Sequence, residues 1–229
     1  IIHPVGIHQF IYHNHSRVCR DDKKRSRKAK VPINYDGLSD AWSDHLGGAF
    51  SDCPSVDVAE ECMIGKGMKV IETNQCTMIP FQKTDDDEVK QLYRNHDVRR
   101  YLGGIRTEDD LQSIFDEMHS MNEEVNWVIR KKNTKEFVGL ISLGLHHDGN
   151  FHEVSYQLLP IWWGKGYGTE VVYAVLDYAF LTLNLPKVGA ETQAANIPSR
   201  RLLEKVGMRE EGRVIRFGEE QVIYSITYK

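Results

Sequence analysis

The chain has 229 residues, of which 41% are hydrophobic and 27% charged, a composition typical of a globular protein with a substantial buried core. A net charge of −4 argues against a nucleic-acid-binding protein that depends on an overall positive field. No run approaches the ~18 apolar residues that cross a bilayer, so we expect no membrane partner. The four cysteines have irregular spacings without a CxxC pair, which predicts reduced thiols in a cytoplasmic protein.

The sequence changes character near residue 68. Residues 1–67 lack sustained hydrophobic periodicity and contain nine basic and nine acidic residues. Their basic run at 20–30 is typical of a solvated segment. We expect residues 1–67 to be an N-terminal extension of unknown role, either partly disordered or not native to the domain. Residues 68–229 carry the whole net charge and are predicted to form one domain.

The predicted elements of this domain begin with a strand over 69–81 and two helices. Acidic residues open the first helix at 84–95, where the helix dipole favours negative charge. The second follows a capping pattern of Thr107 and Asp110, with apolar residues recurring at helical spacing up to Met118. Three strands are then expected over 126–132, 137–145 and 152–160.

A glycine-rich stretch, WGKGYGT, separates the fourth strand from a helix over 169–182 that is apolar nearly all round and should be buried. A strand at 186–192 precedes a short helix, for which Asn196 is the expected cap and Gly207 the end. Two strands complete the chain. This order predicts an α/β (α+β) fold, a mixed sheet of about seven strands with helices on both faces.

The glycine stretch fits an anion-binding helix N-terminus, which carries roughly +0.5 of an elementary charge and exposes unpaired N–H groups. Missing side chains would let phosphate oxygens approach, Lys165 would add a cation, and Tyr167 could cover an organic ligand. From these residues alone, tight packing explains the glycines equally well. The stretch matches neither the P-loop nor the dinucleotide-binding pattern of glycines.

Three segments, SYQLLPIWWGKGYGTEVV, ETQAANIPSRRLLEKVGM and REEG, resemble the GNAT superfamily of N-acetyltransferases, in particular its Rim-like branch that acetylates ribosomal-protein N-termini. Gly166 and Gly168 occupy the two small positions of the superfamily signature, whereas Trp163 replaces the usual Gln or Arg. The resemblance covers about residues 69–229 and is strongest over 153–212. It implies a mostly antiparallel sheet that splays between the fourth and fifth strands.

The same resemblance implies an acetyl-CoA-dependent N-acetyltransferase that needs no metal. Acetyl-CoA would lie in the splay, with its pyrophosphate on the glycine stretch and its pantetheine arm along the main chain of the fourth strand. For Asn196 a plain helix cap is the alternative role. The residues carried over to cofactor binding are Leu158, Leu159, Gly164, Lys165, Gly166, Tyr167, Gly168, Thr169, Asn196 and Ser199.

Two residues are candidates for proton transfer by this resemblance. Glu153, at the start of the fourth strand, is the candidate base that takes the amine proton, and an exposed strand-end glutamate is the alternative. Leu203 stands where many members carry an acidic tyrosine. Ser199 therefore becomes the candidate acid for the leaving thiolate, or a hydroxyl that only binds the sulfur.

Tyr101, Trp127 and His146 are weaker candidates for the substrate pocket, with ordinary packing as the alternative. His146 is followed by His147, but no third ligand at metal-site spacing is evident, so we expect no metal.

The favoured acceptor is a peptide or protein N-terminal amine. A small-molecule amine, such as a polyamine or an antibiotic, and a non-catalytic acyl-CoA-binding or regulatory module remain alternatives. We expect a monomer or homodimer without a nucleic-acid partner.

Overall fold

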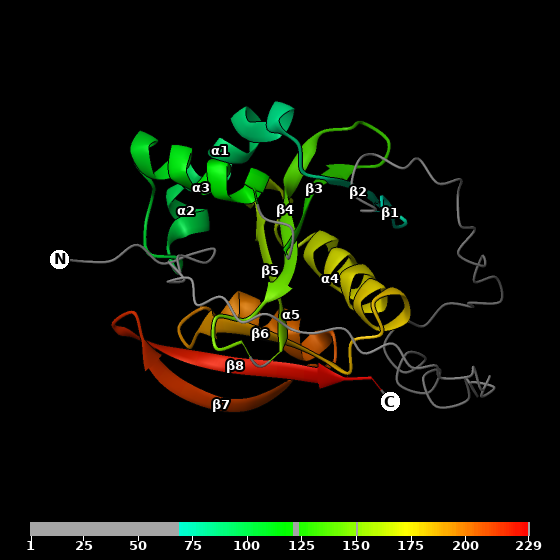
Figure 1. Cartoon of the computed structure of the whole chain (residues 1–229), viewed down its shortest axis with the longest axis vertical. Helices are drawn as coiled ribbons and strands as arrows, with labels where there is room; N and C mark the ends of the chain where they lie inside the picture. Colours follow the sequence, from blue (N-terminus) through cyan, green and yellow to red (C-terminus); the bar gives the residue numbers. More distant parts are fainter. Residues whose placement is uncertain (1–68, 121–123, 150, 229) are drawn as a thin grey trace, which may run out of the picture. The chain divides into compact units, whose positions relative to one another are not determined.

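The computed structural model describes residues 69–120, 124–149 and 151–228, so the predictions for residues 1–67 lie outside the described part of the chain. These residues form one sheet with the strand order β1-β2-β3-β4-β5-β6-β8-β7 (Figure 1). Only β5 and β6 pair in parallel; every other pairing is antiparallel. The strands are β1 (Ile71–Glu72), β2 (Cys76–Pro80), β3 (Val125–Lys131), β4 (Phe137–Leu145), β5 (His152–Leu158), β6 (Lys187–Gln193), β7 (Arg209–Arg216) and β8 (Glu219–Thr227).

Helices cover both faces of the sheet, as the sequence predicts (Figure 1). On one face lie α1 (Asp86–Arg94), α2 (His96–Arg99) and α3 (Glu108–Ser120), whose apolar side chains pack against Val128 and Leu140. On the other face lie α4 (Tyr167–Asp177), which continues into a π-helical turn, and α5 (Ile197–Lys205). In the described residues no helix has the length and apolar character that a membrane span requires.

Two details differ from the predicted elements. The strand expected over 69–81 is two short strands, because Thr73 forms a turn in which its hydroxyl accepts the Cys76 N–H at 2.9 Å. The described sheet therefore has eight strands rather than about seven, and the expected splay lies between β5 and β6. Helix α2 was not predicted, since four residues are too few for a periodic signal; the Asn95 side chain caps it by accepting the N–H groups of Asp97 and Val98.

The separation of β5 and β6 is the feature that positions the site. They pair only at His152↔Val188 and Glu153↔Gly189, whereas β4 follows β5 along its whole length and β6 pairs with β8 over seven residues. Beyond Glu153, the edge of β5 that faces β6 therefore has no strand partner. The sheet opens at this point, as the family resemblance implies.

Alternation along β5 sends its side chains to opposite faces beside this opening. Val154 and Leu158 belong to the core that α4 and α5 cover. Gln157 faces the other side, where its Oε1 accepts a hydrogen bond from the Arg99 guanidinium of α2 at 3.3 Å. The Glu153 side chain lies on the same face of the sheet as Gln157, and the Tyr156 side chain lies on the same face as Leu158.

Candidate active site

The glycine stretch forms an open turn at the N-terminus of α4. Gly164 and Gly166 have φ of +70° and +88°, a left-handed conformation that glycine adopts without steric cost. Apart from the chain neighbours of each glycine, no heavy atom of the described residues lies within 4 Å of the position that a Cβ would take there. The first N–H groups of α4 have no intrahelical partner by the geometry of a helix, so the turn leaves donors of the kind that bind an anion.

Two neighbouring residues of this stretch pack into the protein interior. A Cβ on Gly168 would lie 2.8 Å from Leu202 Cδ1, so this glycine permits close contact of α4 with α5. Tyr167 is 6% exposed and its ring lies edge-on against Trp162, with 5.5 Å between the ring centres. The expectation that the Tyr167 ring covers a ligand is therefore wrong, because that ring is part of the core.

The end of β5 meets the glycine stretch through a tryptophan. Trp163 donates its indole N–H to the Leu158 carbonyl at 2.8 Å, and the Leu159 N–H donates to the Val138 carbonyl at 3.0 Å. A cofactor arm that paired with the Leu158 carbonyl would compete with the Trp163 indole. Trp163 is the residue that replaces the usual Gln or Arg of the superfamily signature.

Glu153 is buried at the opening, with only 11% of its side chain exposed. Its Oε1 accepts the Glu191 N–H at 3.1 Å, and its Oε2 lies 3.9 Å from His146 Nε2. Burial raises the pKa of Glu153 to about 7, because loss of water around the carboxylate outweighs the opposing effects of His146 and the Glu191 N–H. An exposed strand-end glutamate is thereby excluded, and such a carboxyl group can exchange a proton near neutral pH.

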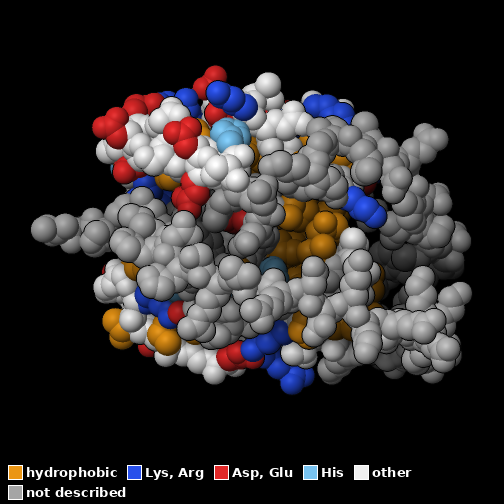
Figure 2. Space-filling view, viewed as in Figure 1, with side chains coloured by type: hydrophobic (Ala, Val, Ile, Leu, Met, Phe, Trp, Pro, Cys, Tyr) orange, Lys and Arg blue, Asp and Glu red, His pale blue; other side chains and the backbone are white. Residues whose placement is uncertain are grey.

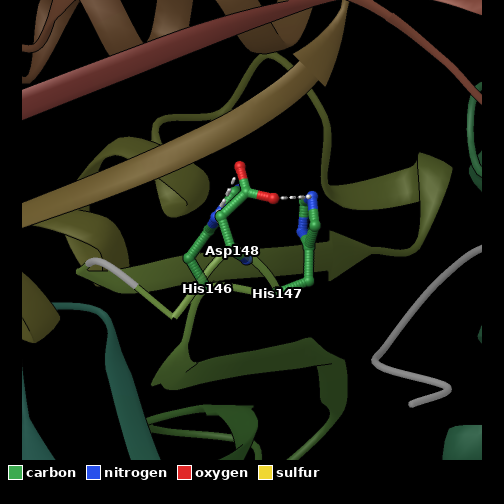
Figure 3. A group of neighbouring side chains, drawn as sticks. All are labelled: His146, His147 and Asp148. Atoms are coloured by element: carbon green, nitrogen blue, oxygen red, sulfur yellow. Dashed lines mark hydrogen bonds and ion pairs between the residues drawn. The ribbon is translucent and has the colours of Figure 1, made fainter.

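His146 contacts the candidate base rather than lining an open pocket, since the residue is 1% exposed. Its Nδ1 accepts the Asp148 N–H at 3.2 Å, which leaves the ring proton on Nε2, 3.2 Å from Glu191 Oε2. Figure 3 shows that Asp148 lies beside both His146 and His147. The expectation that no third ligand-type residue accompanies the two histidines is therefore wrong.

A cation from the chain itself sits at this cluster. Arg216 contacts His147 and donates to Glu191 Oε2 at 2.7 Å and to Asp148 Oδ2 at 3.1 Å. Burial, followed by the effects of the neighbouring His146 and Arg216, holds the pKa of His147 below its usual range. Because a guanidinium already balances these carboxylates, we assign no metal to the cluster, and metal-free transfer stays a prediction.

Of the other substrate candidates, Trp127 does not reach the site. It is fully buried, lies edge-on against Tyr178 with 5.4 Å between ring centres, and donates its indole N–H to the Lys69 carbonyl. The prediction of a pocket-lining Trp127 is therefore wrong. Tyr101 is partly exposed just beyond α2, and its role stays a prediction.

The candidate acid lies on the opposite face of the sheet from the candidate base. Ser199 is in the first turn of α5, where Asn196 Oδ1 accepts its N–H at 3.3 Å, so Asn196 acts as the helix cap. The Ser199 hydroxyl is 2.9 Å from the hydroxyl of Tyr156, which reaches it from β5. Sequence reasoning missed Tyr156, although its position in step with Val154 and Leu158 indicated the side of the sheet to which it points.

The model of the family described as Acetyltransferase (GNAT) domain matches residues 76–209, more than half of the chain. The chain belongs to the GNAT family of acetyltransferases. This establishes an acetyl-CoA-dependent N-acetyltransferase, whereas membership of the Rim-like branch stays a prediction.

Curated proteins with similar sequences include other N-acetyltransferases. An uncharacterized N-acetyltransferase of Bacillus subtilis, YoaA, is 30% identical over 151 residues, which cover 62% of this chain and 84% of that protein. Spermidine N(1)-acetyltransferase of Vibrio cholerae is 26% identical over 147 residues, covering 62% and 83%.

Solved structures agree. A GNAT-family acetyltransferase from Bacillus anthracis superposes with a TM-score of 0.61 at 25% identity, covering 69% of this chain and 98% of that chain. Spermidine N-acetyltransferase from Vibrio cholerae in complex with CoA and spermine gives a TM-score of 0.60 at 23% identity, covering 68% and 96%. The second likeness shows the fold alone.

The pKa of Glu153 predicts how activity of this GNAT enzyme depends on pH. The carboxyl group is protonated, and inactive as a base, below about pH 7. At saturating amine, kcat should therefore fall about tenfold for each pH unit below that value and level off above it. Steady-state rates from pH 5 to pH 9 measure this, and a kcat that stays constant from pH 5 to pH 7 would exclude Glu153 as the base.

Proposed function

We propose that acetyl-CoA binds across the separation of β5 and β6 and that its acetyl group passes to a primary amine on the α1–α3 side. The observation that carries this proposal is that Glu153 and Ser199 lie on opposite faces of the sheet beside the same opening. A thioester lying in the opening would have an amine and a carboxylate on one side and a hydroxyl near its sulfur on the other. The open turn at Gly164 and Gly166 supports placing the pyrophosphate at the N-terminus of α4.

The proposed reaction forms an N–C bond and breaks a C–S bond. Glu153 takes a proton from the amine, whose nitrogen attacks the thioester carbonyl. The C–S electron pair then leaves on sulfur, towards which the Ser199 hydroxyl donates a hydrogen bond. The proton removed from nitrogen returns through solvent to the thiolate, so the products are an amide and the free thiol.

Charge on the amine side favours a polyamine as one acceptor. Between residues 83 and 120, six Lys and Arg residues stand against ten Asp and Glu residues. Figure 2 shows acidic side chains gathered where Figure 1 places α1 and α3, and both helices have three acidic residues in their first turn. A negative surface raises the local concentration of a polycation, and the relative from Vibrio cholerae was solved with spermine.

The pKa of Glu153 favours a second acceptor, an N-terminal α-amine. A base that titrates near pH 7 is better matched to an α-amine, with an ordinary pKa of about 7.7 to 8.0, than to an alkylamine near about 10.4. An enzyme that acetylates an alkylamine would also have to lower the pKa of the bound amine.

A panel of acceptors tests the proposal. Thiol release from acetyl-CoA is followed with spermidine and spermine, peptides with free N-termini and the same peptides N-terminally blocked, and aminoglycosides. Turnover with polyamines whose KM rises steeply with salt identifies the first acceptor class. Turnover lost on blocking the peptide identifies the second. Binding of acetyl-CoA without turnover on any amine would leave a non-catalytic acyl-CoA-binding module and overturn the proposed transfer.

A further inference from the structure

We propose that Tyr156 is a positioning residue for the leaving-group side of this reaction, because its phenol aims the Ser199 hydroxyl at the opening between β5 and β6. The inference rests on the proposed function. It assigns a role to a partly buried polar contact that joins β5 to α5 on the far side of the opening from Glu153.

The contact is specific and comes from distant parts of the chain. The Tyr156 hydroxyl lies 2.9 Å from Ser199 Oγ and 3.5 Å from the Ser199 carbonyl oxygen. β5 and α5 are held together here beyond the last paired residues of β5 and β6. Asn196 fixes the other side of Ser199 by accepting its N–H, so the serine is held both by its main chain and by its hydroxyl.

Leu203, the next residue of α5 on this side, is 1% exposed and carries no polar group. The hydroxyl groups of Ser199 and Tyr156, 2.9 Å apart, are therefore the proton donors that we consider for the leaving group.

A thiolate near Ser199 would set the direction of the hydrogen bonds. Negative charge on sulfur attracts the Ser199 proton, which leaves the Ser199 oxygen to accept from Tyr156. Burial raises the pKa of Tyr156 to about 12, so the phenol keeps its proton and acts as a donor throughout the working range of the enzyme. Successive donors polarise one another, which strengthens the bond to the developing thiolate. No proton has to leave Tyr156 in this arrangement.

The chain offers matched controls for removing this hydroxyl. Tyr224 and Tyr173 also donate to α5, but at other residues, to Glu204 Oε1 at 3.0 Å and to the Lys205 carbonyl at 2.7 Å. Tyr→Phe at each of the three positions deletes one oxygen and keeps the ring. Only Tyr156→Phe should lower kcat, by about tenfold, with the KM for acetyl-CoA changed less than about twofold.

A double-mutant cycle separates positioning from a loss of structure. In a Ser199→Ala background there is no hydroxyl left to aim, so adding Tyr156→Phe should cost no further activity. Thermal melting of Tyr156→Phe against Tyr224→Phe checks that both remain folded. Equal slowing by Tyr156→Phe in both backgrounds, or activity of Tyr156→Phe equal to that of Tyr224→Phe, would overturn the inference. Absence of turnover in the unsubstituted protein would instead refute the proposed function.

Discussion

Replacement of Glu153 by Gln is expected to lower kcat by roughly 10²–10⁴, the usual contribution of a general base. Gln fills the same space and keeps an oxygen for the Glu191 N–H, but it cannot take a proton from the amine. The rate should also lose its dependence on pH between 5 and 7, because the group that titrates there is gone. Steady-state kinetics with the acceptor found in the panel measure both effects.

Glu117→Gln is the matched control for this substitution. The pKa of Glu117 is also raised, mainly by partial burial, and this residue lies on α3, where it adds to the negative surface but has no assigned part in proton transfer. Its substitution should leave kcat within about twofold. Comparable losses in the two variants would mean that removing a buried carboxylate disturbs the fold, and the assignment of Glu153 as the base would fail.

The pH dependence of protein stability tests the raised pKa of Glu153 independently of activity. Its folded pKa of about 7 exceeds the ordinary value of 4.5, so between these values the folded protein binds more protons than the unfolded chain. This group therefore makes the protein less stable as the pH rises from 4.5 towards 7. Glu153→Gln removes that loss, so the variant should melt at a higher temperature relative to the unsubstituted protein at pH 8 than at pH 5.

Replacement of Gly166 by Val is expected to weaken acetyl-CoA binding by at least about tenfold. At a φ of +88° a β-branched residue is strained, and relief of that strain would turn the first N–H groups of α4 away from the open space. The loss should appear in calorimetric titration with acetyl-CoA and as a smaller shift of the melting temperature by the cofactor.

Gly218 supplies the control for Gly166. Its φ is +81°, and among the described residues other than its chain neighbours no heavy atom lies within 4 Å of a Cβ placed there, but it lies in the turn between β7 and β8. Gly218→Val should therefore destabilise the protein by a similar amount without lowering its affinity for acetyl-CoA. Equal affinity of both variants for acetyl-CoA would show that the turn at Gly166 does not bind the cofactor.

Local patterns were enough to predict most of the fold. The acidic first turns of α1 and α3, the Thr107–Asp110 capping pair and the Asn196 cap are interactions within a few residues, and all are present. The opening of the sheet was expected from the family resemblance alone, and the structure shows it as a β5–β6 pairing that stops after two residue pairs.

The surroundings of Glu153 could not be read from the sequence because they come from four separate elements. Glu191 from β6 and His146 from the turn after β4 reach the carboxylate on β5, and Arg216 from β7 binds Glu191 behind them. The same holds for Tyr156 and Ser199, which are 43 residues apart. Trp127 shows the opposite failure: an aromatic residue near a strand end suggested a pocket, but burial between sheet and α4 explains it.

A crystal structure of the protein with CoA tests the central claim most directly. The account predicts the pyrophosphate at the first N–H groups of α4, beside Gly164 and Gly166, and the sulfur in the opening between β5 and β6, within hydrogen-bonding reach of the Ser199 hydroxyl. Glu153 should lie on the opposite face, with space for an amine between its carboxylate and the sulfur. A pyrophosphate bound elsewhere, or a sulfur on the same face as Glu153 and away from Ser199, would contradict it.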